Sequence, residues 1–258
     1  MVYRYLLLVL LIGFSQSILA QNSRLANEYY RSGEYEKAAQ IYLQLFEKTG
    51  KNDYYFGQYI ESLLAIENYD EAEDAIKKQI KIRPKDIQLY VTYGNLFEKQ
   101  YEPEKAEKQY KRAIENMPPD IGSISKIGSA FTRLSKYDLA IETYEKGEEL
   151  VDRDNVFAPN LAELYRRKGN SSKMIENYLN SLDRYQNNIN SLITTLQRSL
   201  TDEDYEELQT QLYAKIQEED VSDAAYEILE WTFIYRKEFK RAFRQARSLD
   251  RKNEENGY

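Results

Sequence analysis

The chain has 258 residues, of which 42% are hydrophobic and 31% are charged, with 10 glycines and 5 prolines. This composition favours a globular, mainly helical protein over a sheet protein or a disordered one. A net charge of -7 repels a phosphate backbone, so we expect no nucleic-acid partner. Histidine and cysteine are absent, which excludes the usual zinc, copper and haem ligands and the commonest catalytic bases and thiolates. We therefore expect no metal, no cofactor, no small-molecule substrate and no enzymatic activity.

The amino terminus has the pattern of a signal peptide. Arg4 precedes an apolar run from Leu6 to Phe14, and a polar break at residues 15–17 leads to Ala20. The run is shorter than the roughly 20 residues that a helix needs to cross a bilayer. We expect residues 1–20 to be removed and the chain to be exported, to the periplasm or the cell surface. The alternative is an uncleaved anchor, and the chain would then contact the membrane through this anchor or through its partners.

A short tract then recurs with a 34-residue period. Gly33-Glu34-Tyr35-Glu36-Lys37-Ala38 is followed at this spacing by Glu67-Asn68-Tyr69-Asp70-Glu71-Ala72. The residue that ends the tract is repeated in phase at Ala106, Ala140, Met174, Leu208 and Ala242. These positions define seven repeats, because no insertion disturbs the period.

Each repeat is predicted to be a helical hairpin. Two apolar patterns of helical period are separated by a polar or glycine break within every repeat. Gly33 and Gly169 lie where a first helix should end, and Pro103 suits the first turn of a second helix. Pro84 and Pro118 end one repeat before the next. The helix breakers thus share the period of the apolar pattern.

This pattern resembles the tetratricopeptide repeat (TPR) family. That family places a small residue near an aromatic residue in the first helix, then an alanine, an aromatic residue and a proline in the second. Repeats three and four match it best, through Gly94, Phe97, Ala106, Tyr110 and Pro118, and through Gly128, Phe131, Ala140 and Tyr144. The resemblance implies an all-α fold, a right-handed superhelical solenoid of about seven antiparallel helix pairs.

The solenoid is expected to fill residues 21–250 and to be followed by a polar tail over residues 251–258. Repeats six and seven are expected to diverge. In repeats two, six and seven the small residue at the helix crossing is replaced by Ile60, Leu196 and Glu230. We expect altered packing angles at these three crossings.

The first helices line the concave side in this family, so their outward positions supply the candidate binding residues. The candidates are Asn27, Tyr30, Arg31, Asn95, Lys99, Arg133, Arg166, Arg167, Trp231 and Tyr235. Arg31, Lys99, Arg133 and Arg167 follow the 34-residue period and form a basic column. One interpretation is a positive groove for an acidic peptide. The other is structural, because a cation near the end of a helix complements the helix dipole.

Two aromatic candidates in repeat seven also allow two interpretations. Trp231 and Tyr235 could anchor a partner, since exposed aromatic side chains are favoured at binding hot spots. They could equally be buried against a capping helix.

The resemblance implies a protein that binds other proteins or peptides, and the basic column favours partners with acidic segments. We expect a scaffold or adaptor of the cell envelope. The alternative is the amino-terminal sensory or docking part of a longer envelope or signalling protein that continues beyond Tyr258. A glycan-cleaving enzyme with paired carboxylates is disfavoured, because a solenoid of this type offers no deep cleft.

Overall fold

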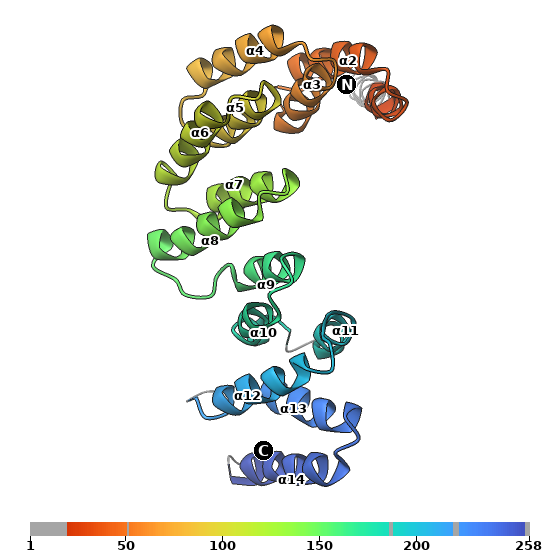
Figure 1. The fold of residues 1–258 in the computed structure, drawn as a ribbon, viewed down its shortest axis with the longest axis vertical. Helices are drawn as coiled ribbons and strands as arrows, with labels where there is room; N and C mark the ends of the chain where they lie inside the picture. Colours follow the sequence, from red (N-terminus) through yellow and green to blue (C-terminus); the bar gives the residue numbers. More distant parts are fainter. Residues whose placement is uncertain (1–19, 51, 186–187, 219–221, 256–258) are drawn as a thin grey trace, which may run out of the picture. The chain divides into compact units, whose positions relative to one another are not determined.

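A computed structural model describes residues 20–50, 52–185, 188–218 and 222–255 of the chain. These residues form helices joined by short turns, and they contain no strand (Figure 1). Residues 1–19 of the expected signal peptide lie outside the described part of the chain. The described part contains no helix whose length and apolar character would allow it to span a membrane.

The described helices begin with one over residues 20–31 and continue in pairs. The later helices are α2 (Tyr35–Lys48), α3 (Asp53–Ala65), α4 (Tyr69–Ile82), α5 (Gln88–Lys99), α6 (Pro103–Glu115), α7 (Ile121–Arg133), α8 (Tyr137–Val151), α9 (Ala158–Arg167), α10 (Ser171–Leu179), α11 (Ile189–Ser199), α12 (Asp204–Lys215), α13 (Asp223–Tyr235) and α14 (Phe239–Glu255), with a short 3₁₀ helix, η1 (Leu182–Arg184), after α10. They belong to two compact bodies, Met1–Asn116 and Met117–Tyr258, which we call the N-terminal and C-terminal bodies.

The helix boundaries repeat the period of the sequence. The second helices of repeats one to five begin at Tyr35, Tyr69, Pro103, Tyr137 and Ser171, which keep the 34-residue spacing. Repeat seven keeps this phase, since α14 begins at Phe239. The all-α fold of repeated helix pairs predicted from the sequence is confirmed.

The turn between the two helices of a repeat also recurs. Its central residue has a positive φ in every repeat but the sixth, at Gly33, Glu67, Tyr101, Ser135, Gly169 and Lys237. The next residue donates its N–H to the carbonyl five residues earlier, from Glu34 to Tyr29 and from Asn170 to Tyr165 for example, at 2.8 and 2.9 Å. This is the Schellman arrangement, which satisfies the free carbonyls at the end of the first helix. Gly33 and Gly169 suit the left-handed backbone, and four other residue types adopt it too.

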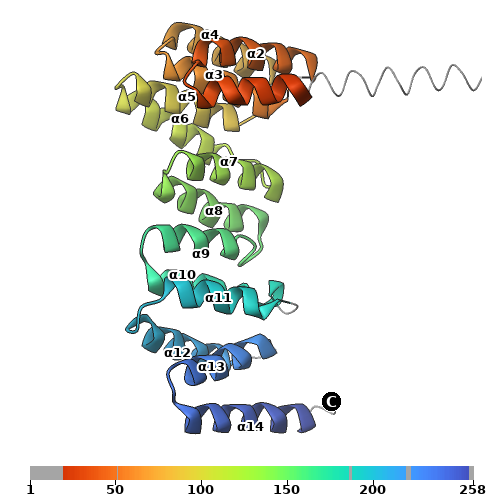
Figure 2. The same ribbon diagram turned by 90° about the vertical axis from the view of Figure 1, so that its right-hand side faces the viewer.

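Repeat six is the exception among the described turns. Glu203, at the equivalent position, has a φ of -70°. α11 makes little contact with α12, which packs instead against α10 and α13 (Figure 2). Repeat seven, also expected to diverge, forms a regular hairpin of α13 and α14. The divergence in turn geometry is therefore confined to repeat six.

The helix crossings explain why small residues recur in the first helices. A Cβ atom added at Gly94 or at Gly128 would overlap the ring of Tyr110 or Tyr144, which projects from the second helix of the same repeat. In repeats two and six the bulky residues Ile60 and Leu196 are both fully buried. At the position of the tyrosine these two repeats carry Ile76 and Leu212. A larger residue on the first helix is thus accompanied by an aliphatic residue on the second helix.

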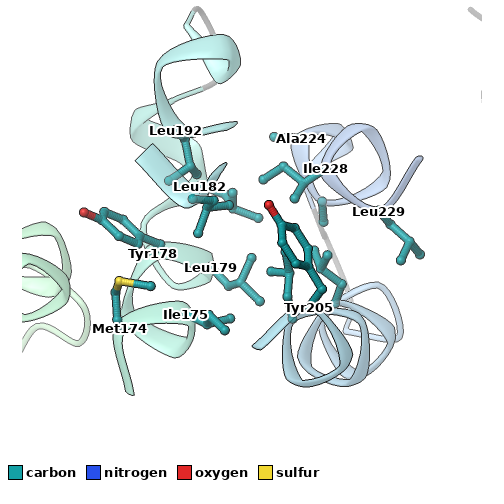
Figure 3. Close-up of a cluster of buried hydrophobic side chains, with 14 of the residues drawn as sticks. Met174, Ile175, Tyr178, Leu179, Leu182, Leu192, Tyr205, Ala224, Ile228 and Leu229 are labelled. Carbon is teal, nitrogen blue, oxygen red and sulfur yellow. The ribbon is translucent and has the colours of Figure 1, made fainter. Parts of the chain in front are cut away.

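The cores of the two bodies have their own hydrophobic clusters. In the C-terminal body, side chains of α9 to α14 converge on a cluster that includes Met174, Tyr178, Leu192, Tyr205 and Ile228 (Figure 3). α14 continues to Glu255, so the helix extends into the segment 251–258 that the sequence predicts as a polar tail.

Candidate protein-binding surface

The four residues of the basic column occupy equivalent places in the structure. Arg31, Lys99, Arg133 and Arg167 are each the last helical residue of a first helix, and all four are exposed. A cation at this place interacts favourably with the partial negative charge of the helix end. The structural interpretation of the column is thus consistent with its geometry, and binding must be argued from each residue's own surroundings.

The two cations of repeat five are held by a carboxylate of their own helix. Arg166 donates to Glu163 through Nε and an Nη at 2.7 and 2.8 Å, and Arg167 donates through Nε at 2.9 Å. The hydrogen bond from Arg166 lowers the pKa of Glu163, and Arg167 lowers the pKa of Tyr137 by hydrogen bonding to it. Both guanidinium groups therefore already have acceptors within repeat five.

Arg133 differs from them. Its guanidinium has no carboxylate partner among the described residues, and it lines an open pocket of about 340 Å³. The pocket is formed by residues of α7, α8 and α9, namely Ser129, Thr132, Arg133, Tyr144, Pro159, Asn160, Glu163 and Leu164. Asn160 donates to the Tyr144 hydroxyl at 3.4 Å. The pocket also contains Glu163, whose carboxylate already pairs with Arg166 and Arg167, so Arg133 can donate to the carboxylate of a ligand without first losing an ion pair of its own.

The N-terminal body carries two further cations of the column. Arg31 lines a shallow pocket of about 450 Å³ with Arg24, Asn27 and Glu28. Lys99 is exposed, and no hydrogen bond or ion pair holds its ammonium group within the described residues. Both side chains are therefore open to a ligand.

The other candidate residues of the N-terminal body are Asn27, Asn95 and Tyr30, and each contacts neighbouring side chains. The Asn27 Oδ1 atom accepts hydrogen bonds from the hydroxyls of Tyr42 and Tyr54 at 2.8 and 3.2 Å. Burial raises the pKa of Tyr42 to about 12, so this hydroxyl keeps its proton at neutral pH. Asn95 is buried and donates to Glu61 at 3.3 Å. Tyr30 packs edge-on against Tyr35, with 5.1 Å between the ring centroids.

Trp231 and Tyr235 form an aromatic cluster at the end of α13. Tyr235 stacks on the buried Tyr205 with 4.8 Å between centroids, and Trp231 lies 5.6 Å from Tyr235. Trp231 is half-buried, whereas Tyr235 is 42% exposed. The cluster is partly accessible, and it fits either sequence interpretation.

Sequence reasoning missed two residues of this surface. Glu163 forms ion pairs with Arg166 and Arg167, and it lies on the same 34-residue period as Asn27 and Asn95. The period could therefore have identified it. Asn160 reaches the Arg133 pocket from α9, and this requires the packing of three helices. In the described ranges no group of three or more acidic side chains is arranged to hold a metal ion.

Comparison with known proteins agrees with the repeat geometry. The chain is 29% identical over 133 residues to the TPR repeat-containing protein MJ1428 of Methanocaldococcus jannaschii, a match that covers 52% of this chain and 23% of that protein. The match supports the resemblance to the tetratricopeptide repeat family that the sequence pattern predicts. No family model matches the sequence.

Further similarities of the chain are partial. It is 33% identical over 104 residues to the human protein O-mannosyl-transferase TMTC1, covering 39% of this chain and 12% of that protein. Among solved structures it is similar to TTC0263, a TPR protein of Thermus thermophilus, with 16% identity and a TM-score of 0.37, covering 68% and 96% of the two chains. It is also similar to the C-terminal part of a TPR repeat-containing protein from Cytophaga hutchinsonii, with 18% identity and a TM-score of 0.37, covering 82% and 79%. The curated relatives are thus much longer than the matched segments.

Proposed function

We propose that this TPR chain is a protein-binding scaffold of the cell envelope that holds an acidic segment of a partner against the exposed face of its first helices. The observation that carries the proposal is the environment of Arg133. This cation lies in an open pocket beside Ser129 and Asn160, and no described carboxylate neutralises it.

The chemistry of the pocket favours an extended acidic peptide. A carboxylate that reaches Arg133 forms a charge-assisted hydrogen bond, and Ser129 and Asn160 offer neutral groups to the peptide main chain. The pocket is open and shallow, so it suits one side chain of a longer ligand better than a whole small molecule. Arg31 and Lys99 offer separate contacts of the same kind in the N-terminal body.

The first test is a binding measurement with a charge reversal. A fluorescein-labelled peptide of alternating Asp and Gly is titrated with the full chain and with the Arg133→Glu variant, and the anisotropy is recorded. The variant should bind roughly tenfold more weakly, because a hydrogen bond to a charged group contributes about 1.5–3 kcal/mol. Added salt should weaken binding of the unchanged chain.

The matched control is Arg153→Glu, which reverses a charge on an exposed residue between α8 and α9 without touching the pocket. Equal losses in both variants would show that net charge alone governs binding. An undiminished affinity in Arg133→Glu would remove the Arg133 pocket from the proposal. A crosslinked pull-down from the native envelope with the same two variants extends the test to natural partners.

The envelope location is the second component of the proposal. It is supported by the apolar run and polar break before Ala20. Mass spectrometry of the amino-terminal peptide from fractionated cells should find a chain that begins at Gln21 in the periplasmic or surface fraction. Recovery of the chain with Met1 from the cytosol would contradict export.

A further inference from the structure

A second surface lies on α14, the second helix of repeat seven. Phe239 and Phe243 are spaced by one helical turn, and they are 64% and 69% exposed. Together with Lys240 and Arg244 they line an open depression of about 550 Å³. Two large aromatic side chains exposed side by side are unusual on a protein surface and indicate a binding site.

The preceding repeats of the C-terminal body show what covers this place there. In that body Phe243 has in-phase counterparts in Ile141, Ile175 and Gln209, which are all buried, whereas Glu107, in phase in the N-terminal body, is exposed. The helices that carry these counterparts, α8, α10 and α12, are covered by α9, α12 and α13 in turn. Among the described residues, α13 is the helix that packs on α14, and Figure 2 shows no ribbon on the opposite side of α14. The face of α14 that carries Phe243 therefore corresponds to the face on which another helix packs in the preceding repeats of the C-terminal body.

The charges beside the aromatic pair define the chemistry of that helix. Lys240, Arg244, Arg247 and Arg251 are exposed and recur every three or four residues, so they form one stripe along α14. No carboxylate pairs with Lys240 or Arg244 in the described part of the chain. The stripe stands out on a chain whose net charge is -7.

The same charges argue against a second copy of α14 as the occupant. A symmetric contact would bring Lys240 and Arg244 of one chain toward the same cations of the other, and such like-charge contacts are destabilising. We infer that the Phe239–Phe243 face of α14 binds an amphipathic helix of another protein, with apolar residues one turn apart and carboxylates beside them. This surface is independent of the Arg133 pocket.

The test uses two designed helical peptides with the same leucines at i and i+4, flanked by Glu in one peptide and by Lys in the other. Each fluorescein-labelled peptide is titrated with the full chain. The Glu peptide should bind, the Lys peptide should not, and the Phe239→Ser/Phe243→Ser variant should weaken binding by at least about tenfold. Arg244→Glu should weaken it independently, and exposed side chains can be changed in this way without loss of the helical circular dichroism signal.

Controls separate this surface from others. Tyr101→Ser removes an aromatic side chain that is 91% exposed in the N-terminal body, and it should leave peptide binding unchanged. Arg133→Glu should weaken binding of the Glu peptide far less than the double Phe variant does, whereas it should weaken binding of the Asp-Gly peptide more, so failure of the first-helix pocket and failure of the α14 face remain distinguishable. Binding of the Glu peptide that is insensitive to both α14 variants would overturn the inference.

Two other occupants are outcomes of the same experiment. Absence of Glu-peptide binding, together with cosedimentation with phosphatidylglycerol vesicles that is lost in the double Phe variant, would assign the face to a lipid surface and overturn the proposal. Concentration-dependent self-association lost in the double Phe variant, again without peptide binding, would assign it to a second copy and overturn it equally.

Discussion

Repeats four and six have the same length and phase, but they pair their helices differently. In repeat four, α7 ends in a Schellman turn at Ser135, and Gly128 lets α8 approach until the Tyr144 ring lies over the glycine. In repeat six, Leu196 stands in place of the glycine, the turn lacks the left-handed residue, and α12 packs against α10 and α13 instead of α11. The comparison indicates that the period places the helices, whereas the left-handed turn accompanies their pairing, since repeat seven also pairs its helices with Glu230 at the crossing and Lys237 in a left-handed turn.

The largest effect is expected from filling the crossing of repeat four. Gly128→Leu should destabilise the C-terminal body by about 3 kcal/mol, because its side chain would displace the ring of Tyr144 from a packed core. Adding Tyr144→Leu recreates the Leu196 and Leu212 combination of repeat six and should recover part of the loss. The measurement is the urea midpoint by circular dichroism.

The control for this crossing is Gly57→Ala in α3, where a Cβ atom would meet no other atom within 4 Å. It should stabilise its body by roughly 0.5–1 kcal/mol, because alanine is the better helix former. If Gly128→Leu were as harmless as Gly57→Ala, the close approach of the Tyr144 ring would not decide the pairing of α7 and α8.

A smaller, local effect should distinguish α11 from α7 in the unchanged chain. α11 buries the side chains of Leu192 and Leu196, whereas α7 buries four side chains and packs against α8. Amide hydrogens of α11 should exchange with deuterium about tenfold to a hundredfold faster than those of α7, because local opening costs less where fewer apolar contacts are lost. Equal protection, measured by mass spectrometry of peptides from both helices, would mean that α11 is held as firmly as a paired helix.

The smallest effect is expected at the turns. Tyr101 has a φ of +60° and is almost fully exposed, so Tyr101→Gly should stabilise the N-terminal body by roughly 0.5 kcal/mol through relief of the left-handed strain. Glu203→Gly, at the same place in repeat six, should destabilise the C-terminal body by roughly 0.5–1 kcal/mol, because its φ is already negative. Thermal unfolding of both variants provides the measurement, and effects of equal sign would contradict the difference between the two turns.

Much of the fold followed from the sequence because the hairpins are local. Pro103 does occupy the first position of α6, and Gly33 and Gly169 do occupy left-handed turns. The same turn at Lys237 has no glycine to reveal it, since the main-chain hydrogen bonds fix its backbone. The separation of α11 from α12 depends on packing against α10 and α13, which lie outside repeat six, and no local pattern predicts it.

The candidate surface was predictable to a lesser degree. The exposure of Arg133 and Arg167 followed from their place in the repeat, and the spacing of Glu163 from Arg166 and Arg167, at i+3 and i+4, could have indicated their pairing. The contact of Asn27 with Tyr54 joins two repeats and requires the fold. These hydrogen bonds and ion pairs between side chains decide which side chains remain accessible to a partner.

The Schellman turns have a consequence for how this gene can change. Glycine, glutamate, tyrosine, serine and lysine all occupy the central position, at a cost of about 1–2 kcal/mol for a residue other than glycine. Mutational drift at this site is therefore tolerated, and so is duplication or deletion of a whole 34-residue segment, because each copy brings its own complete set of main-chain bonds. Successive copies can lose their resemblance to one another while the hairpin that they encode persists.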